Sequence, residues 1–287
     1  MEIHTVDKAP SYKLPCGYVI RGYSRSAMRS GFKIDRLNIL FDAGLSCMAC
    51  PSCILVTHTH SDHSQSLPQI TTAQPRTFPI YVPEESVKVV KNYMDSFLKL
   101  TECTMDVCME EDVKIKCPII GVKDQQIIDL KVKNENFKIE VIKLNHRVPT
   151  VGYMLSKKVS KLKKEYKNLG RDDIIKLRKA KVPIMDDIYN PIFSYITDTR
   201  VDTIDLRAPT IMVECTFLYD KQYELADKRG HIHWKDLEII VKNNPDKKFI
   251  LIHFSMRYSS KEIEEFFRET GYKNVVVWLD NKVVDFL

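Results

Sequence analysis

The sequence predicts an α/β fold, and three features of the 287-residue chain support this prediction. Short runs of β-branched and aromatic residues alternate with segments whose apolar residues recur at helical spacing. The hydrophobic fraction of 44% is typical of a globular protein with a substantial core. Several side chains that can bind metal or carry charge stand just past an apolar strand: His58, His146, Asp198, Glu214 and His253. Strand ends can share one sheet edge, so these residues are expected to converge on rigid supports.

Strands dominate the first part of the predicted fold. Three short runs, at 18–20, 32–34 and 37–41, predict an opening antiparallel sheet. Apolar runs at 54–57 and 80–82 predict two further strands. A helix is expected to begin in Pro83-Glu84-Glu85-Ser86, because the apolar residues that follow recur at helical spacing: Val87, Val90, Met94, Phe97 and Leu98.

The rest of the chain is predicted to continue as strands with two helices. Strands are expected at 127–130, 137–144, 193–197, 210–213, 249–252 and 275–278. The helices are expected at 234–241 and 261–267. The sequence has no internal repeat and no low-complexity segment, so we expect a single domain spanning residues 1–287.

Bulk features exclude a membrane span and a secretory signal. No stretch approaches the roughly 20 apolar residues that a membrane span requires. The first ten residues carry charges early and lack an apolar segment. We therefore expect a soluble protein with no membrane partner, in the cytoplasm or the nucleus.

Three of the eight cysteines form the run Cys47, Cys50 and Cys53. A structural zinc or redox site is one interpretation of this spacing, and buried thiols are the other. A tetrahedral zinc site needs a fourth ligand, which the sequence does not place. We favour buried thiols, because Cys53 begins a predicted buried strand.

Positive charge is concentrated in one segment. The net charge is +6, yet residues 156–183 contain eleven Lys or Arg and only three acidic residues. Such a run can be a solvated helical face or a surface for acidic partners, among which we favour nucleic-acid phosphates. Residues 156–190 are expected to form an arm or insertion rather than a second domain. Its candidate RNA contacts are Lys161, Lys163, Lys164 and Lys167.

A run of potential metal ligands follows the predicted strand at 54–57. His58-Thr59-His60-Ser61-Asp62-His63 offers four ligands within six residues, a donor set suited to zinc. On a tight turn, His58 and His60 can face one metal while Asp62 and His63 face a second. The remaining donors can come from His146, Asp198 and His253. We interpret His4 as an ordinary core or surface residue.

This run resembles the signature of the metallo-β-lactamase superfamily, and other motifs resemble those of its tRNase Z branch, nearest to the short plant-type enzymes. These motifs occur in order along nearly the whole chain: Gly22-Tyr23-Ser24, Asn145-His146-Arg147-Val148-Pro149-Thr150-Val151-Gly152-Tyr153, Leu162-Lys163-Lys164-Glu165-Tyr166, Glu214-Cys215-Thr216-Phe217, Gly230-His231-Ile232-His233 and Leu251-Ile252-His253-Phe254-Ser255-Met256-Arg257-Tyr258. The resemblance implies an αββα sandwich from which a basic arm protrudes.

The resemblance also implies a site with two zinc ions per subunit, although the ligands would accept Mn²⁺ or Fe²⁺ as well. The first zinc would be held by His58, His60 and His146. The second would be held by Asp62, His63 and His253, with Asp198 between the two ions. Two close metal ions activate water and neutralise a phosphodiester that undergoes in-line displacement. Asp62 can also orient the attacking nucleophile.

Other residues are assigned roles around this predicted centre. Glu214 with His231 fits the proton donor for the leaving oxygen, and His233 is the alternative donor. Two residues apart in an extended turn, the two histidines would point opposite ways, and His233 would then support the following helix. Asp42 either orients a metal-bound histidine or caps a turn. Ser255 and Arg257 either contact RNA or anchor their own loop.

The implied activity is endonucleolytic removal of the 3′ trailer from precursor tRNA, leaving a 3′ hydroxyl and a 5′ phosphate. The resemblance implies a homodimer in which one subunit's arm presents RNA to the other subunit's metal site. Two rival functions are hydrolysis of other substrates, such as small phosphodiesters or thioesters, and RNA binding without catalysis.

The chain departs from the family pattern at two places near the predicted centre. Gln65-Ser66 stands where the family tends to have Gly-Gly, and Thr197 stands where it usually has Gly before the bridging Asp198. A lost glycine can shift the backbone, so these departures bear on efficiency rather than on the existence of the site.

Overall fold

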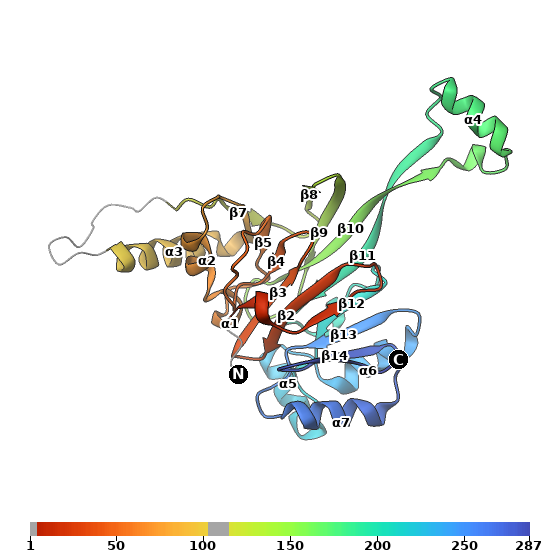
Figure 1. Ribbon diagram of the computed structural model, residues 1–287. Helices are drawn as coiled ribbons and strands as arrows, with labels where there is room; N and C mark the ends of the chain where they lie inside the picture. The colour runs from red at the N-terminus through yellow and green to blue at the C-terminus, as the bar shows by residue number, and fades with distance from the viewer. Residues whose placement is uncertain (1–4, 103–114) are drawn as a thin grey trace.

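Two mixed β-sheets pack face to face in the computed structural model, which describes residues 5–102 and 115–287 (Figure 1). Helices cover the outer face of each sheet, so the order of layers is αββα. The predicted α/β class and the sandwich architecture are therefore confirmed. Within the described residues, no helix has both the length and the apolar character that crossing a membrane requires.

The first sheet has seven strands in sequential order. The strands β1 to β4 are antiparallel, as predicted for β2 to β4, and β4 to β7 are parallel. Their bounds are β1 Ser11–Lys13, β2 Val19–Arg25, β3 Arg29–Ile34, β4 Ile39–Phe41, β5 Cys53–Leu55, β6 Ile80–Pro83 and β7 Ile119–Val122. The helical segments of this half are η1 Val6–Lys8, α1 Ser61–Ser64, α2 Leu67–Ala73, η2 Glu84–Ser86 and α3 Val87–Glu102.

The second sheet has eight strands in the order β15-β14-β13-β12-β11-β10-β9-β8. The strands β8 to β11 are antiparallel and β11 to β14 are parallel. Their bounds are β8 Ile127–Val132, β9 Glu135–Lys143, β10 Val151–Leu162, β11 Met185–Ile196, β12 Thr210–Glu214, β13 Lys248–Ile252, β14 Val275–Trp278 and β15 Val283–Asp285. The other helical segments are η3 Lys164–Tyr166, α4 Arg171–Lys179, η4 Val201–Thr203, η5 Asp220–Gln222, α5 Tyr223–Arg229, α6 Trp234–Asn243 and α7 Ser260–Thr270.

Three hydrophobic clusters hold the four layers together. The cluster between the sheets packs aromatic side chains from both of them, such as Phe41 against Phe193 and Phe32 against Trp278. A second cluster lies between the second sheet and its helices, where Trp234 of α6 packs edge-on against Phe267 of α7. The third lies between the first sheet and its helices. Burial of apolar area on both faces explains the near-continuous apolar runs of the parallel strands.

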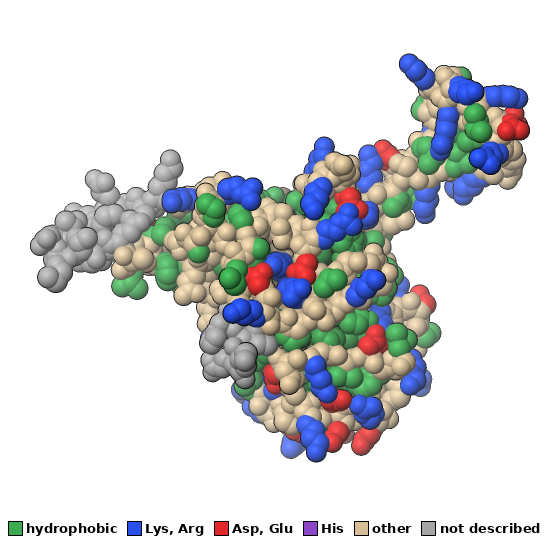
Figure 2. All heavy atoms as spheres, in the orientation of Figure 1, with side chains coloured by type: hydrophobic (Ala, Val, Ile, Leu, Met, Phe, Trp, Pro, Cys, Tyr) green, Lys and Arg blue, Asp and Glu red, His purple; other side chains and the backbone are tan. Residues whose placement is uncertain are grey.

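The strands β10 and β11 run beyond the sheet as a two-stranded ribbon (Figure 1). The register shifts between Leu155 and Ser156, and from there β10 changes from buried residues to partly or fully exposed ones. The ribbon ends at η3 and α4, and α4 has no buried residue. Lysine and arginine side chains are spread over this protruding arm (Figure 2). The polar sequence of the arm leaves it outside the core, since it has little apolar surface to bury.

Several predicted element boundaries were wrong. The strand expected at 37–41 begins at Ile39, and the expected helix start at residue 84 is a 3-10 turn before α3. The strand expected at 193–197 is only the end of β11. β10 was not predicted at all, because the lysines in its outer half hide its apolar alternation.

Candidate metal centre

Functional side chains gather where the parallel strands of both sheets end. The chain leaves β5 at Leu55, passes through His58 and His60, and enters α1 at Ser61. Gly44 allows the turn after β4 to lie against α1, since a Cβ at this position would come within 1.9 Å of the Asp62 carbonyl oxygen. The turn therefore presses the ligand-rich loop against the sheet edge.

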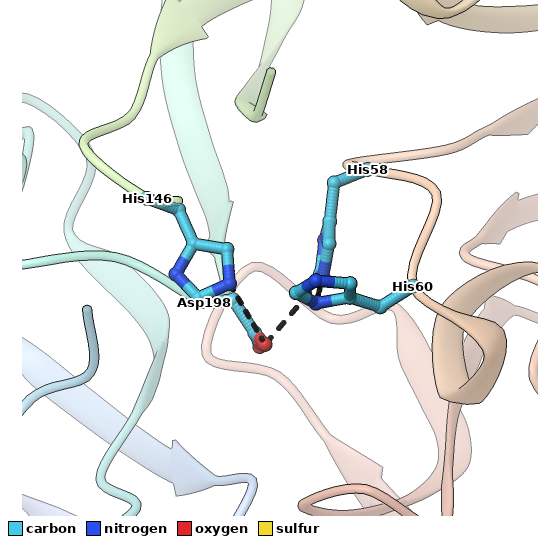
Figure 3. Close-up of side chains that lie close together, drawn as sticks. All are labelled: His58, His60, His146 and Asp198. Carbon is cyan, nitrogen blue, oxygen red and sulfur yellow. Dashed lines mark hydrogen bonds and ion pairs between the residues drawn. The ribbon is translucent and has the colours of Figure 1, made fainter. Parts of the chain in front are cut away.

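One group of possible metal ligands consists of His58, His60, His146 and Asp198, whose ligand atoms lie within 4.8 Å of one another. Figure 3 shows His58 and His60 on one loop converging with His146 and Asp198, which come from other segments of the chain. The Oδ2 atom of Asp198 lies 3.5 Å from His58 Nε2 and 3.9 Å from His146 Nε2. The first predicted ligand set is therefore assembled in space.

A second group consists of Asp62, His63 and His253, again with ligand atoms within 4.8 Å of one another. The other Asp198 oxygen, Oδ1, lies 3.4 Å from His63 Nε2 and 3.3 Å from His253 Nε2. Asp198 thus turns one oxygen toward each group. This geometry is what a carboxylate placed between two metal ions requires.

Three of the ligand histidines are each oriented by a hydrogen bond on the side away from the centre. His63 Nδ1 lies 2.8 Å from Asp42 Oδ2, and His146 Nδ1 donates to the Gly230 carbonyl at 2.7 Å. His253 Nδ1 lies 3.0 Å from the Thr216 hydroxyl. Such outer bonds fix the ring and leave Nε2 facing inward. The His146 Nε2 atom is buried and has no hydrogen-bond partner among the described residues, as expected for a metal ligand.

Asp42 anchors two of the ligand histidines. Besides His63, its carboxylate accepts hydrogen bonds from the Thr57 amide (2.8 Å), the Thr57 hydroxyl (2.9 Å) and the Tyr195 hydroxyl (2.9 Å). The Thr57 hydroxyl also lies 3.1 Å from His58 Nδ1. The fully buried Asp42 therefore orients histidines rather than merely capping its turn.

Burial and neighbouring charges set the protonation states of the central donors. Burial raises the pKa of Asp198, but the adjacent His253 and His63 lower that pKa further, to well below its usual range. Burial lowers the pKa of His63, yet Asp198 and Asp42 raise it well above the ordinary value. Burial and the neighbouring His63 hold the pKa of His58 well below normal, so that ring is neutral. Ionised carboxylates and neutral imidazoles are the forms that bind divalent metals, so Asp198 and His58 are ready to bind one, whereas His63 would give up its proton when a metal ion binds.

His231 and Glu214 form a pair beside the cluster. Gly230 ends α5 in the left-handed conformation at φ +71°, which turns His231 inward. His231 Nδ1 lies 3.0 Å from Glu214 Oε1 and 3.9 Å from Asp198 Oδ2. Burial lowers the pKa of His231, but Glu214 raises it to about 9. His231 is therefore protonated at neutral pH and can donate a proton at the cluster.

His233 faces away from the cluster. Its Nδ1 accepts a hydrogen bond from the Lys235 amide at 3.1 Å, and its Nε2 donates to the Tyr219 carbonyl at 3.0 Å. These bonds cap the start of α6. The two histidines point in different directions, and His231 is the one brought to the centre.

The predicted RNA-contacting residues fall into two places. Ser255 and Arg257 lie in the loop after His253, where Arg257 Nη1 donates to the Ser255 hydroxyl at 3.1 Å. The four lysines of the basic segment lie on the protruding arm, away from the metal centre (Figure 1): Lys161, Lys163, Lys164 and Lys167.

The two departures from the family pattern have structural uses. The Gln65 side-chain amide donates to the carbonyl oxygens of Gly44 (3.1 Å) and Met28 (3.3 Å), which ties α1 to two turns of the first sheet. The buried Thr197 hydroxyl donates to Asp198 Oδ1 at 2.9 Å. Both side chains therefore brace the cluster.

Some supporting residues escaped the sequence analysis. Thr216 lies two residues after Glu214 and donates to Glu214 Oε2 at 2.5 Å, a same-face spacing that could have been noticed. Tyr195 reaches Asp42 from the other sheet, and no sequence signal marks that contact.

The cysteine run holds free thiols. Cys47 and Cys53 are buried as predicted, whereas Cys50 is only half-buried. Among the described residues these cysteines belong to no group of possible metal ligands. His4 lies outside the described residues.

Comparisons with known proteins agree with this fold. The layers and the His/Asp cluster define a protein of the metallo-β-lactamase fold, as in the solved structure of the metallo-β-lactamase fold protein YhfI from Bacillus subtilis. That structure aligns with a TM-score of 0.55 at 15% identity, over 91% of this chain and 96% of that one. No protein-family model matches the chain.

Sequence similarity narrows the class. The chain is 28% identical over 269 residues to tRNase Z TRZ1 of Arabidopsis thaliana, covering 87% of this chain and 89% of that protein. It is 27% identical to the chloroplastic tRNase Z TRZ2 of the same plant, covering 86% and 70%. The chain is therefore similar, over most of its length, to plant proteins named tRNase Z.

Proposed function

We propose that this protein is a zinc-dependent endoribonuclease that removes the 3′ trailer from precursor tRNA. The observation that carries the proposal is the position of Asp198, whose two oxygens face two groups of ligands next to the Glu214–His231 pair. The two groups would each hold one zinc ion, or Mn²⁺ or Fe²⁺ in its place. Similarity to proteins named tRNase Z supports precursor tRNA as the substrate.

The chain's own residues would guide a phosphodiester cleavage. Metal ions held by the two groups would lower the pKa of a water molecule and neutralise charge on the phosphate. Asp62 is held by the Ala27 amide, which donates to its Oδ2 at 2.9 Å, and can accept a proton from the attacking water. The water oxygen bonds to phosphorus as the bond to the 3′ oxygen breaks. His231 gives that oxygen its proton, and Glu214 stabilises the protonated imidazole.

The basic arm would hold the RNA away from the cut. Its lysines face solvent on a ribbon that projects from the body, which suits recognition of a structured RNA by shape and phosphate charge (Figure 2). In a homodimer, one subunit's arm would present the RNA to the metal centre of the other subunit. The products would be a tRNA with a 3′ hydroxyl and a trailer with a 5′ phosphate.

Cleavage of a 3′-extended precursor tRNA tests the function. We expect the zinc-loaded protein to cut once near the discriminator base, and we expect chelated protein and Asp62→Ala to leave the RNA intact. Asp246→Ala serves as the matched control, because Asp246 is exposed in the turn before β13. Turnover of bis(p-nitrophenyl) phosphate by a metal-loaded protein that leaves the RNA uncut would instead support a hydrolase of small phosphodiesters. Metal loading without either turnover would support a non-catalytic RNA-binding protein.

Removal of the arm is expected to weaken RNA binding strongly. Deleting residues 160–182 joins the two strands of the ribbon below its basic tip. The Kd for precursor tRNA should rise by about 10²-fold at low salt, because the deleted lysines can no longer contact phosphates and displace counterions from the RNA. The fourfold alanine variant of Lys161, Lys163, Lys164 and Lys167 should flatten the salt dependence while it keeps the ribbon. Filter binding at several salt concentrations measures both effects, with metal content as the check on folding. An arm-deleted protein with full affinity would contradict the role of the arm.

A further inference from the structure

Two cavities are lined in part by His231, and their charges differ. The larger, of about 500 Å³, is lined by acidic side chains, among them Asp202, Glu224 and Asp236. Its one arginine, Arg200, is paired with Asp227 at 3.0 Å. The smaller cavity, of about 370 Å³, is lined by two arginines, and none of the described residues that line it is acidic. A phosphate approaching His231 is therefore repelled on one side and attracted on the other.

The two arginines of the smaller cavity are Arg229 and Arg257. Within the described part of the chain, neither guanidinium pairs with a carboxylate, although most other arginines of the protein do. Arg257 is held in place by the Ser255 hydroxyl and lies over the Phe217 ring, with its guanidinium carbon 5.9 Å from the ring centroid. Both side chains are exposed, so their donors remain available to an anion from outside.

The position of His231 also defines the direction of the RNA chain, if the proposed cleavage is correct. His231 gives its proton to the 3′ oxygen that leaves the phosphorus. The nucleotide that keeps this oxygen must therefore sit next to His231. Of the two cavities that His231 lines, only the one with Arg229 and Arg257 accepts the charge of that nucleotide's own 5′ phosphate.

We propose that this cavity is the subsite for the last nucleotide of the mature tRNA, and that Arg229 binds the phosphodiester on the 5′ side of that nucleotide. Arg257 shares this phosphate, and Phe217 lines the floor beneath it. Guanidinium groups bind phosphate oxygens through two parallel N–H donors, which gives position as well as charge. The inference rests on the proposed function and adds to it the direction of the substrate and one residue, Arg229, that no motif had marked.

The test pairs an enzyme variant with a modified substrate. A neutral methylphosphonate replaces either the phosphodiester one nucleotide 5′ of the cut or the one 3′ of the cut. Arg229→Ala is expected to raise the KM for unmodified precursor about 10- to 100-fold, as for loss of a charge-assisted hydrogen bond. Arg229→Lys should recover part of this loss, because it keeps the charge without the paired donors. Lys228→Ala, an exposed neighbour that does not line the cavity, is the matched control and should behave as wild type.

The substrate modifications identify the phosphate that Arg229 contacts. The 5′-side methylphosphonate should raise the KM of the wild type by a similar factor. It should cause no further rise in the KM of Arg229→Ala. The 3′-side methylphosphonate should change the KM of the wild type and of Arg229→Ala by the same factor. Unchanged KM in Arg229→Ala, or a full further loss with the 5′-side modification, would overturn the subsite while wild-type cleavage leaves the proposed function intact. A wild type that cuts no precursor would overturn both.

Discussion

Asp198→Ala is expected to lose both metal ions and to cut precursor tRNA at least roughly 10⁴-fold more slowly, because water at neutral pH is a poor nucleophile without metal activation. The reason is geometric. Asp198 Oδ1 lies 3.3–3.4 Å from two histidines of one group, and Oδ2 lies 3.5–3.9 Å from two histidines of the other. Without this carboxylate each group has one donor fewer, and no negative charge remains between the two cations to offset their repulsion. Metal content after gel filtration and single-turnover cleavage measure the two effects.

Asp198→Asn separates charge from shape in the same experiment. The asparagine amide keeps one oxygen but has no net charge. We therefore expect the Asp198→Asn protein to hold at most one metal ion and to cleave almost no RNA. Asp246→Ala, which lies far from the centre, should keep full metal content and rate. An Asp198→Ala protein that still holds two ions would contradict the placement of Asp198 between the two groups.

His231→Ala is expected to slow cleavage by about 10²- to 10⁴-fold, the usual contribution of a positioned general acid. Metal content should be unchanged, since His231 is outside both predicted zinc-ligand sets, although it also lies with Asp198 and His253 in a third group of possible metal ligands. A substrate with a sulfur in place of the leaving 3′ oxygen needs no protonation, so it should restore much of the lost rate. His233→Ala is the paired control and should lose stability rather than chemistry, because His233 caps α6. Equal losses of cleavage rate in His231→Ala and His233→Ala would contradict the assignment of His231 as the general acid.

The contact between Glu214 and His231 also determines how the cleavage rate depends on pH. Burial lowers the pKa of His231, but Glu214 raises it to about 9, so the acid is protonated at neutral pH and is lost as pH rises through 9. Glu214→Gln removes the raising charge and leaves the lowering effect of burial. The alkaline limb of the pH–rate profile should therefore move to lower pH in Glu214→Gln. A limb that stays at its wild-type pH would show that another group controls it.

Much of the metal centre could be predicted from the sequence because its residues follow recognisable local patterns. His58 to His63 form one short run after an apolar strand, and Asp198 and His253 follow later strands. Parallel strands end at a common edge, so these residues were expected to meet without knowledge of the register. The arm could be recognised from its charge, but β10 could not be recognised as a strand, since lysines interrupt its apolar alternation.

The local sequence indicates which donors reach the centre of this protein, but the direction in which each donor faces depends on how the chain packs. His231 and His233 differ by two positions, and only the left-handed turn at Gly230 and the hydrogen bonds around α6 select between them. The contact between Asp42 and Tyr195, and the meeting of Arg229 and Arg257 at one cavity, arise from packing of segments far apart in the chain. The positions of strands along the chain follow from local periodicity, whereas side-chain direction depends on backbone dihedrals and on neighbours that only the folded chain supplies.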